Sequence, residues 1–164
     1  MLKQGDYVVY SNSGICRVED TIMLNMMQKG DKEYYLLIPI NEKTSKIYLP
    51  VGSIDERIRM AMNKEQAMQL INNAREIDEI YVRNDKEREN VYKDATMSND
   101  PYKLVSVLKT ILERKTEREK SGKKTTTTDD KYLKLVEGQL YGELSHALQM
   151  EKEQIKQLML QNLF

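Results

Sequence analysis

Residues 5–20, GDYVVYSNSGICRVED, carry the pattern that predicts β structure for the N-terminal third of the chain. Two runs rich in β-branched and aromatic residues, at 7–10 and 15–22, flank a break that ends in Gly14, as in two strands joined by a tight turn. Similar runs follow at 33–38 and 46–51, with turn-forming residues at 26–32 and 41–45 between them. Four or five strands at this spacing predict a small β barrel.

The use of glycine and proline changes near residue 52. These residues interrupt the first third at short intervals, whereas residues 53–121 contain no Gly and only Pro101. From there apolar residues recur with helical spacing, beginning with Ala67, Leu70 and Ile71 behind a capping Asn63. We therefore predict an α+β chain, with a β domain over residues 1–60 followed by an all-α helical domain over 61–164.

Further helices are predicted along the second domain. Residues 78–95 are polar and read as a largely solvated helix, and Asp100 with Pro101 starts a clearer one. A polar loop over 120–130 separates it from a helix whose apolar stripe begins at Leu133. A helical extension from about residue 150 keeps the stripe, and it is open whether this segment docks, dimerises or frays.

Composition excludes several classes of function. The chain has 164 residues, 26 basic and 26 acidic, with one His, one Cys and no apolar run of membrane-spanning length. Its start carries no secretory signal, and the lone Cys16 has no partner for an internal disulfide, so we expect a cytoplasmic protein without a membrane anchor. Neither a metal-ligand spacing nor a Gly-rich phosphate loop is present, so we expect no enzyme activity, no cofactor and no metal.

Three collinear motifs carry a resemblance to a known family. GDYVVYSNSGICRVED, then KEYYLLIPI at 32–40, then KIYLPV at 46–51 resemble the N-terminal module of the CarD/CdnL bacterial transcription regulators, which transcription-repair coupling factors share. The resemblance continues through MSNDPYKLVSVLKTILERKTER at 97–118 and LYGELSHAL at 140–148. It implies a Tudor-like module that binds the RNA polymerase β subunit. It also implies a helical domain that contacts promoter DNA upstream of the bubble and modulates open-complex stability.

The resemblance also implies where polymerase binds. In the family the contact uses the edge and the side chains of the second and last strands of the module. In this sequence those places are Met23, Leu24, Ile47, Tyr48 and Leu49. Relatives often carry Arg there, so apolar and aromatic contacts would have to provide the anchoring in this chain.

The predicted DNA contact departs from the family. Relatives present a Trp that wedges into the minor groove, but this chain has no Trp, and the matching position is Asp85 or Arg83. The nearest aromatic residues are Tyr81 and Tyr92. Residues 103–124 carry eight basic residues against three acidic ones, which indicates weak, sequence-independent phosphate contact or simply a solvated helix and loop. The candidate DNA-binding residues are Arg83, Lys86, Arg88, Lys115, Lys120, Lys123 and Lys124.

A second hypothesis remains open. The balanced charge and the missing Trp favour a protein-interaction or structural adaptor, whose helical half binds a protein partner or self-associates through the C-terminal helix. Under the first hypothesis the zero net charge of the chain excludes strong autonomous DNA binding. It is compatible with a weak DNA contact that polymerase tethers, because tethering raises the effective concentration of the two surfaces.

Overall fold

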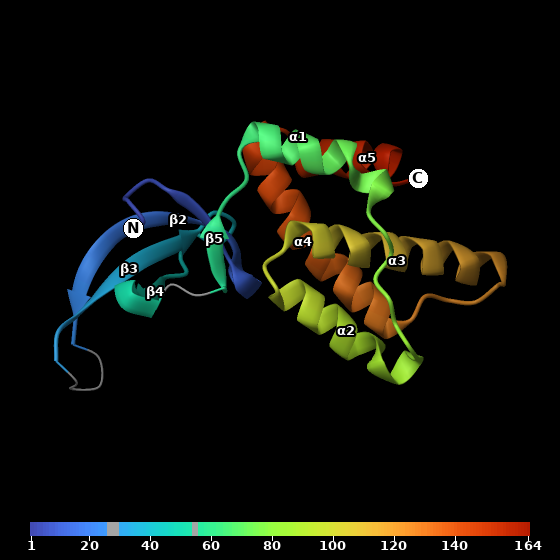
Figure 1. Cartoon of the computed structure of the whole chain (residues 1–164), viewed down its shortest axis with the longest axis horizontal. Helices are drawn as coiled ribbons and strands as arrows, with labels where there is room; N and C mark the ends of the chain where they lie inside the picture. The colour runs from blue at the N-terminus through green and yellow to red at the C-terminus, as the bar shows by residue number, and fades with distance from the viewer. Residues whose placement is uncertain (26–29, 54–55) are drawn as a thin grey trace. The chain divides into compact units, whose positions relative to one another are not determined.

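The chain consists of two compact units. The computed structural model describes residues 1–25, 30–53 and 56–164, and it divides the chain into Met1–Ala61 and Met62–Phe164. Strands make up the first unit and helices the second, so the predicted α+β class is confirmed (Figure 1). In the described part of the chain, no helix is both long and apolar enough to cross a membrane.

The N-terminal unit is a single antiparallel sheet with the order β4-β3-β2-β1-β5. Its strands are β1 (Tyr7–Tyr10), β2 (Gly14–Leu24), β3 (Lys32–Pro39), β4 (Ile47–Pro50) and β5 (Ile58–Met60). A 3₁₀ turn, η1 (Ser11–Ser13), joins β1 to β2, and Gly14 follows it at a φ of 67°, which glycine adopts without strain. The turn predicted over 26–32 lies partly outside the described residues.

Closure of the sheet into a barrel is not confirmed. β4 and β5 are the two edge strands, and among the described residues no ladder joins them. β4 has four residues and β5 has three, so each edge offers few backbone groups for pairing. The unit is therefore described as an open five-stranded sheet.

One face of this sheet holds the core cluster of the unit, whereas the other face combines the buried Val9, Ile15 and Tyr34 with half-buried and exposed side chains. One face, with Val8, Cys16, Leu37 and Leu49, forms the core, and Leu2 from the chain start packs against it. Cys16 is fully buried on this face, and burial raises the pKa of its thiol to about 11. We call the opposite face, which carries Tyr7, Arg17, Leu36, Ile38 and Tyr48, the outer face.

A bulge in β2 decides which side chains near its end belong to each face. Val18 pairs with Leu37 and Asp20 pairs with Leu36, so Glu19 is an extra residue without a partner position in β3. Simple alternation from Val18 would place Leu24 on the core face. Because of the bulge, Leu24 pairs with Lys32 and falls on the outer face.

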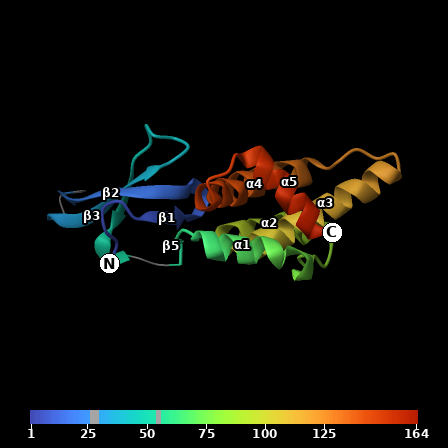
Figure 2. The same cartoon turned by 90° about the horizontal axis from the view of Figure 1, so that it is seen from above.

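The C-terminal unit packs its helices around one apolar core. It contains α1 (Lys64–Asn72), the 3₁₀ turn η4 (Ala74–Glu76), α2 (Asp85–Met97), α3 (Pro101–Lys120), α4 (Thr127–Leu148) and α5 (Lys152–Leu163), seen from a second direction in Figure 2. The predicted capping residues Asn63 and Asp100 both accept backbone N–H groups at the starts of their helices. Thr126 does the same for α4, which therefore starts earlier than the apolar stripe indicates.

The prediction of a helix over 78–95 is wrong in its first part. The helix begins only at Asp85, and residues 77–84 form an extended strap across α3. Lys109 donates from Nζ to the carbonyl oxygens of Arg75 and Ile77 at 2.8 and 2.9 Å, and Thr110 Oγ1 accepts the Ile80 N–H at 2.9 Å. These side chains satisfy the backbone groups that a helix would have paired internally.

Helix α2 is also less solvated than its composition indicates. Tyr92 is fully buried, and Ala95 and Thr96 are nearly so. The C-terminal extension docks on its own unit, because Ile155 and Met159 of α5 are fully buried in the core of this unit. Helix α5 packs on α1 and α4 (Figure 1 and Figure 2).

Candidate functional site

The structure separates the five residues predicted for the polymerase contact. Tyr48 pairs with Leu36 and lies on the outer face, where it is 40% exposed. Leu24 lies on the same face and is half-buried. These two side chains are the members of the predicted set that the outer face brings together.

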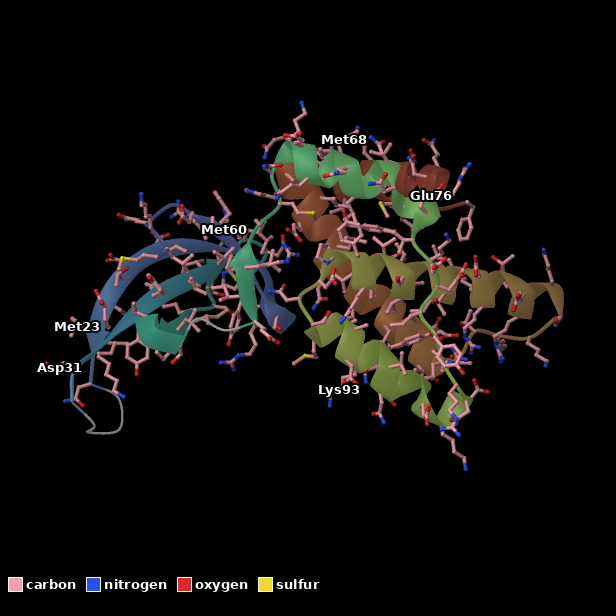
Figure 3. All side chains as sticks on the ribbon, in the orientation of Figure 1. Met23, Asp31, Met60, Met68, Glu76 and Lys93 are labelled. Atoms are coloured by element: carbon pink, nitrogen blue, oxygen red, sulfur yellow. The ribbon has the colours of Figure 1, made fainter. Side chains whose placement is uncertain are left out.

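The other three members lie on the core side of the sheet. Leu49 is 3% exposed because it pairs with Tyr35 in the core, so it is not available to a partner. Ile47 is half-buried against the same core. Met23 pairs with Glu33, so it lies on the same side of the sheet as the core. It is 62% exposed there, because the core does not extend to this end of β2. Figure 3 shows Met23 and Asp31 at the same end of the β2–β3 pair.

In the helical unit, an ionic network joins the regions where α2 and α4 begin and α3 nears its end. Asp129 is 1% exposed; it lies 3.0 Å from Arg114 Nε and accepts the Tyr92 hydroxyl at 3.2 Å. Tyr92 and Tyr132 pack edge to face with centroids 5.6 Å apart. Because every polar member has a partner, the network fixes the start of α4 against α2 and α3.

Arg88, a predicted DNA-binding residue, is part of this network. Its Nη2 lies 3.0 Å from Asp85 Oδ1, and its Nη1 donates to the Tyr92 hydroxyl at 3.3 Å. Burial opposes the charge of Arg88, but its hydrogen bonds to Tyr92 and Asp85 outweigh that cost and raise its pKa. With 14% of its side chain exposed, Arg88 contributes mainly to the structure of this unit.

The other predicted cations are more accessible. Lys115 is half-buried, whereas Arg83, Lys86, Lys120, Lys123 and Lys124 are exposed. Arg118 Nε donates to the Lys124 carbonyl oxygen at 2.7 Å, which ties the loop over 121–126 to the end of α3. We call the group Lys120, Lys123 and Lys124 the loop cations. They lie close together in sequence and at one end of the unit.

Comparison with known families identifies the first unit. Residues 2–62 match the family model for the CarD-like/TRCF RID domain. The N-terminal unit is a CarD-like/TRCF RID domain. The matched range contains all five described strands, and it indicates an interaction with RNA polymerase. No curated protein sequence matches the chain.

The outer face of the RID domain carries the two predicted contact residues that the sheet brings together. Leu24 and Tyr48 come from β2 and β4, two strands that pair with β3 on either side, and Tyr48 offers a large amphipathic surface. Exposed tyrosines are frequent anchors of protein interfaces, since they bury much area at a low entropic cost. The outer face of the RID domain is therefore the candidate polymerase-binding surface.

The structure also separates the two aromatic residues near the missing Trp. Tyr92 is fully buried, whereas Tyr81 is 81% exposed on the strap that follows η4. Its neighbours Ile80 and Val82 pack against the core, so Tyr81 and Arg83 point outward. The alternation of apolar and exposed residues in IYVR, residues 80–83, is the sequence signal for this arrangement. The prediction of a helix over this segment did not use that alternation.

Among the described residues, no group of three or more His, Cys, Asp or Glu side chains is arranged to hold a metal ion.

Proposed function

We propose that this chain is a cytoplasmic, non-catalytic regulator of bacterial transcription. In this proposal the outer face of the RID domain binds the β subunit of RNA polymerase, and the helical unit contacts promoter DNA upstream of the bubble. The observation that carries it is the RID match over residues 2–62, together with the exposed Tyr48 on the sheet. The outcome of binding is a change in open-complex stability.

The DNA contact in this proposal is weak and depends on polymerase. Exposed cations support it: Arg83 and Lys86 near the start of α2, and the loop cations beyond α3. Acidic residues are interleaved, and Glu89 already pairs with Lys131 at 2.9 Å. Tyr81 adds an exposed aromatic surface beside Arg83, suited to stacking on an unpaired base. Such a surface acts once polymerase holds it close to the promoter.

A protein-interaction adaptor is the second candidate function. Met97 and Tyr102, at the end of α2 and the start of α3, are 39% and 45% exposed, which favours a protein partner for that corner. Self-association through α5 is less favoured, because its apolar residues Ile155, Met159 and Leu163 are already buried within their own unit. Leu160 and Phe164 remain partly exposed on α5.

A binding experiment with bacterial core RNA polymerase tests the main proposal. The full chain is compared with Tyr48→Ala and with Tyr102→Ala, a similarly exposed tyrosine outside the RID domain. We expect Tyr48→Ala to weaken binding about fivefold or more, since a truncated interface anchor costs over about 1 kcal/mol. Tyr102→Ala should bind like the unaltered chain. Absence of binding by the full chain overturns the proposal, and equal losses in both variants would move the contact away from the outer face.

A further inference from the structure

The outer face of the RID domain contains a hollow next to Tyr48. Its volume is about 610 Å³, and its apolar floor includes Leu36, Ile38 and Ile40. Arg17, Lys43 and Lys46 stand around that floor. The residue pattern does not reveal this hollow, because its walls come from β1, β2, β3 and the turn that follows β3.

The strand register makes the hollow continuous with the position of Tyr48. Leu36 pairs with Tyr48 across β3 and β4, so it borders both the tyrosine and the hollow. Two positions along β3, Ile38 pairs with Arg17, which in turn pairs with Tyr7 of β1. One face of the sheet thus presents an uninterrupted surface that runs from Tyr48 across Leu36 to Ile38.

Backbone hydrogen bonds hold the turn over residues 40–46, which carries the two lysines of the rim. The Ile40 N–H donates to the Ile15 carbonyl oxygen at 3.1 Å, and the Ser45 N–H donates to the Glu42 carbonyl oxygen at 2.9 Å. Lys43 lies within this turn, and Lys46 lies directly before β4. A partner would therefore meet cations on a backbone that is already ordered, which lowers the entropic cost of binding.

The charge of the rim is unbalanced. Arg17 forms an ion pair with Glu19, so these two side chains largely neutralise each other. Lys43 and Lys46 are exposed, and within the described ranges of the chain neither forms an ion pair. The hollow therefore combines an apolar floor with a positive rim, which complements an apolar side chain flanked by carboxylates.

We propose that this hollow is the second half of the polymerase-binding surface and that it receives an acidic segment of RNA polymerase. The segment places an aliphatic or aromatic side chain on Leu36 and Ile38 and sets its carboxylates beside Lys43 and Lys46. This inference rests on the proposed function. A specific interface buries about 800 Å² on each partner, far more than one tyrosine supplies, and the hollow provides adjoining area on the same face.

The test measures binding of the full chain to bacterial core RNA polymerase over a series of salt concentrations. The double variant Lys43→Glu/Lys46→Glu should bind at least tenfold more weakly, with a reduced dependence on salt. The matched control Lys3→Glu/Lys64→Glu makes the same change of charge at two exposed lysines outside the hollow, and it should bind nearly normally. Both double variants should unfold at the temperature of the unaltered chain, because all four side chains are exposed.

A second variant tests the apolar floor. Ile38→Ala should weaken binding several-fold, with the salt dependence unchanged. If Tyr48→Ala weakens binding while the Lys43→Glu/Lys46→Glu variant binds like its control, the hollow is not part of the surface, although the proposed function stands. If the full chain does not bind polymerase, both proposals fail. Equal weakening in the two double variants would indicate a nonspecific effect of charge and would also overturn the hollow.

Discussion

The RID domain and the helical unit use charged side chains in opposite ways. In the described part of the RID domain no charged side chain is buried, and the buried side chains on both faces of the sheet are almost all apolar. The helical unit buries Lys109, Asp129 and Glu143, each of which forms hydrogen bonds within that unit. A charged residue in the helical unit can therefore be structural even where composition alone indicates a binding surface.

This difference determines which side chains of each unit can be substituted without loss of stability. On the outer face of the RID domain, side chains such as Tyr48 and Lys43 can change with little effect on the free energy of unfolding, since they are exposed. In the helical unit Arg88 and Arg114 hold the structure together, and only the more exposed cations are free to serve a ligand. Variants of Asp129 and of the loop cations test this division.

The largest effect is expected for Asp129→Ala. Removing this carboxylate leaves Arg114 and the Tyr92 hydroxyl without their shared partner, which should lower the free energy of unfolding by about 3 kcal/mol. Urea denaturation followed by circular dichroism measures the change. The control is Asp130→Ala, an exposed neighbour in the same first turn of α4, with an expected loss below about 1 kcal/mol. Similar losses in both variants would show that the network does not stabilise the unit.

A smaller effect is expected from truncating the buried face of α5. Met159→Ala should destabilise the chain by at least about 2 kcal/mol, because the side chain is fully buried in the helical core. Leu160→Ala, at the next position and 39% exposed, should change stability by less than about 0.5 kcal/mol. Thermal unfolding and sedimentation measure stability and mass together. A change of oligomeric state in Leu160→Ala would support the self-association hypothesis instead.

The smallest effect is expected at the loop cations. With polymerase present, Lys123→Ala/Lys124→Ala should change the lifetime of the promoter open complex relative to the unaltered chain. It should also reduce the slope of log binding constant against log salt concentration for promoter binding by about 2. The control Lys64→Ala/Lys152→Ala removes two exposed lysines at the starts of α1 and α5. An unchanged slope in the first variant would remove the loop cations from the DNA contact.

Much of the local structure could be predicted from the sequence. The strand at 7–10 and the caps at Asn63 and Asp100 follow from short-range patterns, since propensity and side-chain capping act within a few residues. The alternation of Ile47, Tyr48 and Leu49 also indicates that Tyr48 faces away from its neighbours. The predicted set of five contact residues did not use that alternation, and it therefore included the buried Leu49.

Features that depend on distant residues could not be predicted in the same way. The strap over 77–84 is stabilised by Lys109 and Thr110, about thirty residues further along the chain, so local periodicity does not reveal it. The roles of Arg88 and Lys109 depend on partners brought together by packing. The hollow beside Tyr48 likewise requires the register of three strand pairs, which the residue pattern does not specify.

The bulge at Glu19 gives the RID domain an unusual kind of variability. Because side chains alternate with a period of two, one inserted or deleted residue at this point exchanges the faces on which all later residues of β2 lie. Met23 and Leu24 would trade places without either residue being substituted. Insertion or deletion of one residue at the bulge can therefore change which side chains of β2 a partner meets, as readily as a substitution can. Residue-by-residue comparison of the end of β2 among related domains is meaningful only between chains that share the extra residue.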